Sequence, residues 1–365
     1  MTTVNVAVEP RPYNAHIEHG LLARAGAVLR DLLPASTKMF VVTVAPVRRK
    51  WAKKLIKSLE AARFEAKVLE MPEGERFKRL ATVEDLAEKL TRLGADRTAV
   101  IVAFGGGVAG DVAGLLASLY MRGVDLVQIP TTVLAQVDAS IGGKTGVNLK
   151  AGKNLVGTFH PPRVVLIDPE VLSSLPDREY RAGLYEALKC GVIGNPSLFR
   201  EFEENRERIL KRDPATVERL IAESVRLKAH VVSVDEKENG LRRVLNFGHT
   251  IGHALEAETG YRTLLHGEAV AWGMVAATRV AAMVGKLDGR AAGRISAAAL
   301  GVGRLPKLDI RSRSIVRRLQ SDKKTRSGKV HFVLPTEIGK VEVVSDVPET
   351  AVLTAVDEIR RLSRS

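Results

Sequence analysis

The segment Val100–Asp111 has the sequence VIVAFGGGVAGD and decides the fold class of this chain. Its first five residues are apolar, which is typical of a short buried strand. Three glycines follow, and apolar residues at helical spacing then continue to Tyr120. Glycine lets a backbone approach an anion closely, and the free N–H groups at a helix start point at that anion. The segment therefore predicts an α/β domain that binds a phosphorylated cofactor.

Residues Gly105–Gly110 also fit the G-x-G-x-x-G spacing of dinucleotide-binding turns. This turn follows a later predicted strand, whereas the usual fingerprint follows the first strand of its domain. Asp125 lies at the distance where the ribose-binding acid is expected, but it precedes its strand instead of ending it. We therefore do not assign Asp125 to the ribose, and a tight glycine turn without a ligand remains the alternative.

Strand-like and helix-like patterns alternate through the first half of the chain. Short apolar runs rich in β-branched residues predict buried strands at 4–8, 39–44, 66–69, 98–104, 126–129 and 164–167. Helical spacing lies between them, near 20–33, 47–62, 82–93 and 109–121. This alternation predicts a mostly parallel, Rossmann-like sheet, whose ligands bind beyond the carboxyl ends of its strands.

After about Pro176 the periodicity becomes almost wholly helical, as in 214–234 and 268–284. A small hairpin is expected at 329–334 and 341–344, and a last helix at 350–362. We therefore predict an α/β domain over 1–178 and a largely α-helical domain over 179–365. Ligand sites commonly form between domains, so we expect the active site in the cleft between these two.

Composition narrows the class of protein. The chain has 365 residues, of which 45% are hydrophobic, which predicts large cores and argues against disorder. No 18-residue apolar run and no signal-peptide pattern at the N-terminus are present, so we expect no membrane span. Cys190 is the only cysteine, which excludes an intrachain disulfide and fits the cytoplasm. The net charge of +14 suits anionic ligands, but the charges are scattered and aromatics make up only 4%, so nucleic acid is not the expected partner.

Four side chains could hold a metal ion. His249 and His253 stand four residues apart on one helical face, and His266 begins another helical run. Glu186 lies on the first helix of the second domain, with Lys189 one turn later. Two imidazoles and one carboxylate can hold Zn²⁺ with a position left open for substrate. Spacing alone does not say which of the three histidines is left for proton transfer.

Basic side chains form a third group of candidates, which could clamp a phosphorylated, carboxylated substrate. They are Arg122, Lys144, Lys153, Lys189, Lys228, Arg242 and the pair Lys323–Lys324. Each alone would more often be a solvated surface charge, but Lys144 and Lys153 lie in glycine-rich stretches. Cys190 is more simply explained as a small buried thiol than as a nucleophile.

Several long motifs resemble the 3-dehydroquinate synthase family, and the likeness runs through nearly the whole chain in the expected order. The motifs are GGGVAGD at 105–111, RG at 122–123, QIPTT at 128–132, DASIGGKTGVN at 138–148, GKNLVG at 152–157 and NFGHTIGH at 246–253. The resemblance implies conversion of 3-deoxy-D-arabino-heptulosonate 7-phosphate to 3-dehydroquinate and phosphate in the shikimate pathway. The implied steps are transient NAD-dependent oxidation, phosphate β-elimination, re-reduction and intramolecular aldol closure.

The same resemblance implies bound NAD⁺, a divalent metal (zinc or cobalt) and a homodimer. The implied metal ligands are Glu186, His249 and His266, which leaves His253 near the proton-transfer chemistry. The implied NAD⁺ contacts are Glu75, Lys78, Gly106, Gly107, Asp111, Thr131, Thr132, Asp138, Lys144 and Lys153. The implied substrate contacts are Arg122, Lys144, Asn154, Lys189, Lys228, Arg242, Asn246 and one of Lys323 or Lys324. One departure concerns the end of the second strand, where Thr43-Val44-Ala45 offers no acid to the adenosine ribose.

Three other functions fit part of the pattern. Another sugar-phosphate cyclase would share the motifs and differ in its substrate. A metal-dependent polyol dehydrogenase would release NADH in proportion to product, but it would not need the polar, lysine-rich loop that we expect over 138–154. A basic nucleic-acid-binding protein would show salt-dependent retention on DNA, but it would leave the Glu/His set without a role.

Overall fold

The computed structural model describes residues 1–9, 11–34, 37–236, 240–325 and 330–364. These residues form two compact units. The first contains 1–176 together with 217–233, and the second contains 177–216 together with 234–365. Within the described residues, no helix combines the length and the apolar character needed to cross a bilayer.

The first unit is built on one seven-stranded sheet in the order β1-β2-β9-β6-β5-β3-β4. Its strands are β1 (Thr2–Val6), β2 (Tyr13–Ile17), β3 (Lys38–Val44), β4 (Glu65–Met71), β5 (Val100–Gly105), β6 (Asp125–Pro130) and β9 (Val164–Ile167). Only β1 and β2 pair antiparallel, and every other neighbouring pair in this sheet is parallel. The predicted mostly parallel α/β sheet is therefore confirmed, with β2 as a strand that the sequence did not predict.

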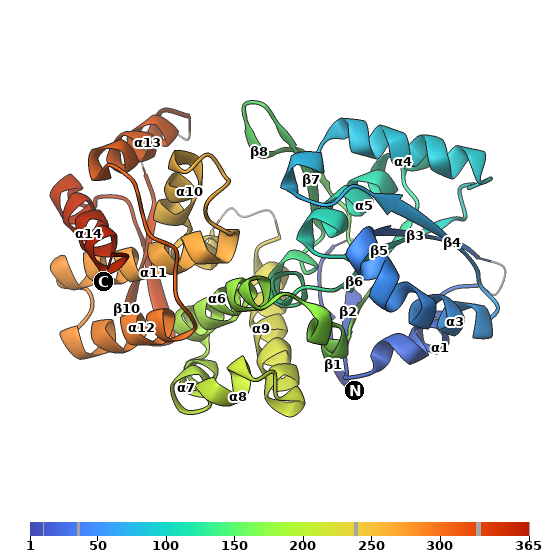
Figure 1. Cartoon of the computed structure of the whole chain (residues 1–365), viewed down its shortest axis with the longest axis horizontal. Coiled ribbons are helices and arrows are strands. Elements are labelled where there is room, and N and C mark those ends of the chain that lie inside the picture. The colour runs from blue at the N-terminus through green and yellow to red at the C-terminus, as the bar shows by residue number, and fades with distance from the viewer. Residues whose placement is uncertain (10, 35–36, 237–239, 326–329, 365) are drawn as a thin grey trace. The chain divides into compact units, whose positions relative to one another are not determined.

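Helices cover both faces of this sheet, as Figure 1 shows. They are α1 (Ala25–Arg30), α2 (Ala45–Val47), α3 (Lys53–Ala61), α4 (Leu80–Arg92) and α5 (Gly107–Leu119). On β3, Phe40 and Val42 pack with the α4 and α5 side, while Met39 and Val41 pack with the α1 and α3 side. Burial of each such side chain contributes roughly 1.5–3 kcal/mol, which favours apolar residues on both faces of a central strand.

A hairpin of β7 (Lys144–Leu149) and β8 (Gly152–Phe159) stands apart from the main sheet. The sequence analysis treated this segment as a polar loop, which is wrong. Thr145 and Val147 point inward and are buried, whereas Leu155 is exposed. A Cβ atom at Gly114 would lie 2.6 Å from Thr145 Cγ2, so the missing side chain lets the hairpin pack closely on α5. Glycines within β7 and β8 interrupt the alternation of apolar and polar residues by which a strand is recognised in a sequence.

The helix α9 (Pro214–Val234) begins and ends where the sequence predicted, but most of it belongs to the first unit. The predicted boundary at 178 assigned all of 179–365 to the second domain, and the structure differs for 217–233. Glu218 accepts a hydrogen bond from His19 N at 2.9 Å, and Ser233 Oγ accepts one from Ala7 N at 2.9 Å. Such contacts depend on tertiary packing, so helical periodicity alone did not predict them.

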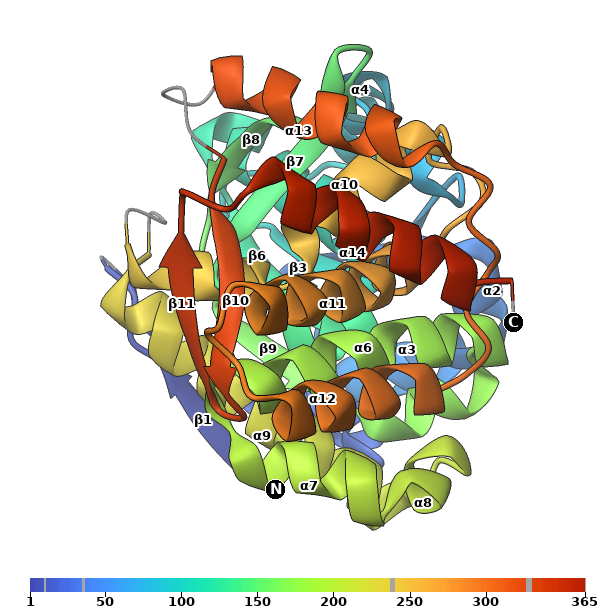
Figure 2. The same cartoon turned by 90° about the vertical axis from the view of Figure 1, so that its left-hand side faces the viewer.

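The second unit is mainly helical, as predicted. Its helices are α6 (Asp177–Gly194), α7 (Pro196–Glu204), α8 (Arg206–Leu210), α10 (His249–Glu258), α11 (His266–Met283), α12 (Gly289–Gly301), α13 (Ser312–Thr325) and α14 (Glu349–Leu362). The expected hairpin is present as β10 (Phe332–Glu337) and β11 (Lys340–Val344). Its predicted start at 329 lies outside the described residues. Figure 2 shows α11 between α12 and α14, and almost all of its residues are buried, as its apolar sequence requires.

Glycines allow α11 to approach its neighbours very closely. A Cβ atom at Gly267 would lie 1.8 Å from Ala182 O of α6, and one at Gly273 would lie 1.9 Å from Gly248 O, which precedes α10. No side chain fits at either position without moving a backbone. These two crossings therefore fix where the first residues of α10 and α11 lie.

Candidate active site

Three imidazoles meet in the second unit. His249 and His266 are the first residues of α10 and α11, and His253 lies one turn further along α10. Each histidine offers a ring nitrogen, and these three atoms lie within 4.8 Å of one another. The ring centroids of His249 and His253 are 5.3 Å apart, and those of His253 and His266 are 5.8 Å apart. The cluster predicted from the i, i+4 spacing is therefore assembled in the fold.

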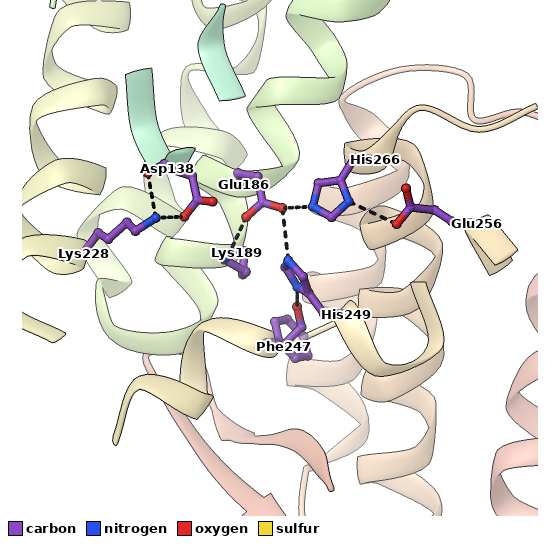
Figure 3. A network of polar contacts seen from close by, with 8 residues as sticks. All are labelled: Asp138, Glu186, Lys189, Lys228, Phe247, His249, Glu256 and His266. Carbon is purple, nitrogen blue, oxygen red and sulfur yellow. Dashed lines mark hydrogen bonds and ion pairs between the residues drawn. The ribbon is translucent and has the colours of Figure 1, made fainter. Parts of the chain in front are cut away.

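Glu186 of α6 lies beside two of these imidazoles, as Figure 3 shows. Its Oε1 atom is 3.6 Å from His249 Nε2 and 3.5 Å from His266 Nε2. The side chain is fully buried, and neither carboxylate oxygen has a hydrogen-bond partner of good geometry among the described residues. Lys189, one turn further along α6, places its ammonium 2.5 Å from Oε2 and is itself buried. A buried carboxylate with unsatisfied oxygens is costly, so this position needs a cation beyond Lys189.

The Nδ1 atoms of His249 and His266 each contact a hydrogen-bond acceptor. His266 Nδ1 lies 3.2 Å from Oε2 of the buried Glu256, and His249 Nδ1 lies 3.1 Å from Phe247 O. Both partners accept, so each Nδ1 carries the proton and each Nε2 is left to face Glu186. Histidines that bind a metal are oriented in this way by a carboxylate or a carbonyl group. The sequence analysis missed Glu256, although its position seven residues after His249 puts it on the same face of α10.

The pKa values of these groups reflect burial and mutual charge. Burial lowers the pKa of His266, but the neighbouring carboxylates of Glu186 and Glu256 outweigh that effect and raise the pKa to about 10. Burial and the Lys189 ammonium together lower the pKa of His249 to about 3. Burial raises the pKa of Glu186, but Lys189 and His249 outweigh it and hold the pKa well below the usual value. Without a metal, the His266 ring is therefore positively charged near neutral pH, with a proton on each nitrogen, and it lies between the carboxylates of Glu186 and Glu256.

This donor set fits a divalent metal ion. It offers one carboxylate and two imidazole nitrogens of fixed tautomer, which is a ligand set that Zn²⁺ takes in catalytic sites with a position left open. A cation bound there would satisfy the orphaned oxygens of Glu186. His253 is more exposed than the other two histidines and is therefore the one left accessible.

In the first unit, the glycine turn lies at the edge where the parallel strands end. Gly106 precedes α5 and has no side chain to cap it. A Cβ atom at Gly106 would lie 2.9 Å from Thr132 Cγ2, and one at Gly107 would lie 3.4 Å from the Cβ atom of Ala139. The turn, the threonine after β6 and the helical turn Ala135–Ala139 are therefore neighbours. Backbone N–H groups at the start of α5 are free to meet a pyrophosphate there.

A polar network adjoins this turn. Lys78 is buried, and its Nζ lies 2.5 Å from Asp111 Oδ2 and 2.5 Å from Asn154 Oδ1. Asn148 Nδ2 donates to Glu75 Oε1 at 2.7 Å, and Asn154 N donates to Asn148 Oδ1 at 2.9 Å. Burial raises the pKa of Asp111, and Lys78 opposes that rise. The hairpin β7–β8 thus carries Asn148 and Asn154 to the residues expected to contact NAD⁺, and the sequence analysis did not include Asn148.

A second ion pair joins α9 to the helical turn Ala135–Ala139. Lys228 is buried and donates to Asp138 Oδ1 and to Asp138 O, both at 2.6 Å. Lys144 is the first residue of β7, and Lys153 is the second residue of β8. Thr131 N donates to Gly105 O at 2.9 Å. Most residues expected to contact NAD⁺ therefore come from one edge of the first unit.

Arg122 is placed differently. It is exposed, has a φ of 69° and stands before β6, whose first residue pairs with the first residue of β5. Arg122 therefore lies at the edge where the strands begin, opposite to the glycine turn. Asp125 lies at the same edge and pairs with Arg11 at 2.7 Å, which agrees with leaving it out of the ribose site.

The remaining candidates belong to the second unit. Arg242 is buried in the turn Leu241–Asn246 and donates through Nη1 to Glu236 O, while Asn246 ends that turn just before the histidine helix. Lys323 and Lys324 lie on α13, but their side chains fall outside the described part of the structure. In the first unit, Thr43 at the end of β3 is fully buried, and the residues that follow it in the chain, Val44 and Ala45, offer no carboxylate.

Comparison with protein families matches nearly three quarters of the chain. The model described as 3-dehydroquinate synthase N-terminal matches residues 68–182. The model described as 3-dehydroquinate synthase C-terminal matches residues 183–325. A 3-dehydroquinate synthase from Koribacter versatilis is 55% identical over 363 residues, which cover 100% of this chain and 99% of that protein.

Solved structures of two other synthases share the fold of this chain over almost its whole length. The 2-epi-5-epi-valiolone synthase from Streptomyces hygroscopicus, solved with NAD⁺ and Zn²⁺ bound, superimposes with a TM-score of 0.88 at 31% identity. That match covers 98% of this chain and 99% of the other. A 2-deoxy-scyllo-inosose synthase complexed with carbaglucose-6-phosphate, NAD⁺ and Co²⁺ superimposes with a TM-score of 0.86 at 28% identity, covering 99% of both chains.

Proposed function

The chain belongs to the 3-dehydroquinate synthase family, and from that premise we propose which of its residues bind, orient and move protons in the reaction. The enzyme converts 3-deoxy-D-arabino-heptulosonate 7-phosphate to 3-dehydroquinate and phosphate, a step of the shikimate pathway. It depends on NAD⁺ and on a divalent metal. The observation that carries the residue assignment is the buried Glu186 carboxylate facing Nε2 of both His249 and His266.

Glu186, His249 and His266 would hold the metal. When bound, the metal supplies a Lewis acid that eases removal of a proton from a substrate hydroxyl. Glu256 and Phe247 O hold the two imidazoles in the tautomer that leaves Nε2 free. Lys189 keeps the second oxygen of Glu186 oriented and brings a buried positive charge for the anionic substrate.

Gly106, Gly107, Asp111, Thr131, Thr132, Asp138, Glu75, Lys78, Lys144 and Lys153 would bind NAD⁺. When bound, NAD⁺ supplies a transient oxidation of the substrate carbinol and its reversal, so the cofactor is not consumed. Gly106 and Gly107 leave the backbone open to the pyrophosphate. Lys78 is already fixed by Asp111 and Asn154, so it can meet an anion with little loss of side-chain entropy.

The substrate would be held by Lys144, Asn154, Lys189, Lys228, Arg242, Asn246 and one of Lys323 or Lys324. Arg122 is left out of this set, because it lies at the edge of the sheet opposite to the glycine turn. Lys228 and Arg242 are buried and held by hydrogen bonds, so each offers a positive charge of fixed position. Orientation of phosphate and carboxylate in this way lowers the barrier to elimination without a dedicated acid. His253, the exposed member of the histidine cluster, would accept and return protons at the substrate hydroxyl.

The proposal also covers the oligomeric state of the protein and its location in the cell. A homodimer is implied by the family resemblance, and sedimentation of the purified protein would test it. A cytoplasmic location suits a chain whose single cysteine, Cys190, is buried and can form no intrachain disulfide.

Substitution Glu186→Gln tests the metal assignment. We expect the variant to lose the metal and at least a hundredfold of its rate of phosphate release, because a neutral amide replaces the carboxylate that faces both Nε2 atoms. Glu179→Gln, an exposed substitution on the same helix, is the control and should keep both. An E186Q protein with full metal content and wild-type turnover would contradict the assignment.

A further inference from the structure

A second concave site lies in the helical unit, on α6 before the metal-facing Glu186. It has a volume of about 420 Å³ and is lined by residues of α6, of the first turn of α11 and of the segment after α12. Its lining includes Arg178, Arg181, Tyr185, Glu268 and Arg304. None of these residues is among those proposed to hold metal, NAD⁺ or substrate, so the reaction leaves this pocket without a role.

Three arginines give the pocket an excess of positive charge. Arg178 makes a two-pronged pair with Glu268, at 2.7 and 2.8 Å, and Arg181 pairs with Asp177 at 2.6 Å. Arg304 is exposed and, among the described residues, makes no hydrogen bond or ion pair. Its five N–H donors therefore remain available at the pocket. A planar guanidinium in a concave site is suited to a carboxylate or a phosphate.

One residue that lines the pocket has an unsatisfied polar atom. Tyr185 is 99% buried, since only 1% of its surface is exposed, and its hydroxyl has no hydrogen-bond partner among the described residues. The other buried tyrosine of α6, Tyr180, donates to Ile209 O at 2.8 Å. Leaving a buried hydroxyl unpaired is unfavourable, so an unpaired one is a candidate for contact with a ligand.

We propose that this pocket, called here the Arg304 pocket, binds a small anionic molecule through a carboxylate or phosphate group. The oxyanion is held by Arg304, and the Tyr185 hydroxyl donates to one of its oxygens. The inference concerns a site separate from the reaction and does not depend on the roles proposed for the metal ligands. Its ligand is a regulator of the protein instead of a substrate.

The pocket is connected to the metal site through Glu268. The Glu268 carboxylate accepts from Leu265 N at 2.8 Å, which caps α11 one residue before His266. Arg178, which pairs with Glu268, also lines the pocket, so an anion held by Arg304 competes with Glu268 for Arg178 and changes the support of that cap. Occupancy of the Arg304 pocket should therefore alter how firmly His266 is held.

Isothermal titration calorimetry of the full-length, metal-loaded protein tests the proposal. The probes are malonate and inorganic phosphate at constant ionic strength, and the variants are Arg304→Gln and Tyr185→Phe. Arg290→Gln is the control, because it removes the same charge from an exposed position at the start of α12. We expect saturable binding that weakens about tenfold in R304Q, less in Y185F and not at all in R290Q.

The two probes separate the sources of the oxyanion. Binding of malonate assigns a carboxylate ligand, and binding of phosphate that R304Q weakens assigns a phosphorylated one. Equal effects of R304Q and R290Q, or no saturable binding of either probe, would overturn the proposal. Catalytic turnover without added anion should be the same in R304Q and wild type, which separates this test from a failure of the proposed active site.

A separate measurement tests the connection between the Arg304 pocket and His266. A bound anion should change the rate at which a chelator removes metal from the wild-type protein, and R304Q should not show that change. Saturable binding with an unchanged rate of metal loss would refute the connection through Glu268.

Discussion

At the scale of single residues, the site depends on how each histidine is oriented. Glu256 and Phe247 O each accept from an Nδ1 atom, and this leaves both Nε2 atoms facing Glu186. A buried carboxylate such as Glu256 is tolerated only when it is paired. The geometry therefore gives Glu256 a positioning role although it does not face the metal position.

Substitution of Glu256 should weaken metal binding without unfolding the protein. We expect a loss of about tenfold in metal affinity for Glu256→Gln and up to about a hundredfold for Glu256→Ala, since the amide still accepts from Nδ1 and the methyl group does not. Competition with a chelator measures both values. Glu258→Gln, which removes a surface partner of Arg318 on the same helix, is the control. Equal affinities for E256A and wild type would refute the positioning role.

Metal binding should release a proton from His266. Its pKa of about 10 means that the imidazole is charged near neutral pH without a metal, whereas His249, with a pKa of about 3, is already neutral. A histidine must be neutral to bind a metal, so the apparent metal affinity should rise about tenfold per pH unit and level off as the pH passes the pKa of His266. Calorimetry in buffers of different ionisation enthalpy should count about one proton per metal near neutral pH. A proton count of zero would contradict this protonation state.

Residue types and spacing predicted much of this site. The i, i+4 spacing of His249 and His253 was enough to predict a shared helical face, and His266 was expected at a helix start. The choice among the histidines came from the family resemblance, because it depends on which Nε2 atoms face Glu186. Glu256 was missed, since a carboxylate on a helix face is usually solvated. The placement of Arg122 at the opposite edge of the sheet depends on strand order, which the segment around it does not reveal.

At the scale of elements, close crossings between helices position the proposed metal ligands. The glycines Gly267 and Gly273 let α11 touch α6 and the residue before α10, so three helices bring their donors within reach of one ion. A core that is packed to native density cannot absorb an added methyl group where a backbone oxygen stands.

The substitution Gly267→Ala tests this crossing. The added Cβ atom would lie 1.8 Å from Ala182 O, so α6 and α11 must separate. We expect the free energy of unfolding to fall by about 1–3 kcal/mol or more, and the metal content to fall with it. Gly293→Ala on α12 is the matched control, because nothing lies within 4 Å of its added Cβ atom and alanine should raise stability by about 0.5–1 kcal/mol. Urea unfolding and metal analysis report both effects, and a stable, metal-replete G267A protein would refute the account of the crossing.

Elements with strong periodicity were predicted well, and glycine-rich ones were not. The strand β5 is apolar at every position, and α9 was predicted at its observed bounds. The hairpin β7–β8 was taken for a loop because Gly146 and Gly157 face each other in it, where a Cβ atom at Gly157 would lie 2.0 Å from Thr145 O. The strand β2 was missed because its buried and polar residues alternate, so it contains no continuous apolar run. It pairs with β1, the outermost strand of the sheet.

At the scale of the whole molecule, the chain separates its two tasks between two units. The sheet unit contributes the glycine turn with the network around Lys78, and the helical unit contributes Glu186 with the histidine cluster. Helical periodicity could not assign 217–233 to the sheet unit, because that assignment depends on contacts such as the one between Lys228 and Asp138. The net charge of +14 is of the sign that attracts phosphorylated, carboxylated metabolites.

The central claim is that the chain eliminates phosphate by using NAD⁺ without consuming it. The most direct test measures phosphate release from 3-deoxy-D-arabino-heptulosonate 7-phosphate with a small amount of NAD⁺, before and after chelation. We predict many phosphates released per NAD⁺, loss of the activity on chelation, and its return with Zn²⁺ or Co²⁺. No phosphate release by the metal-loaded protein would contradict the account, and NADH accumulating with simple polyols would indicate a dehydrogenase instead.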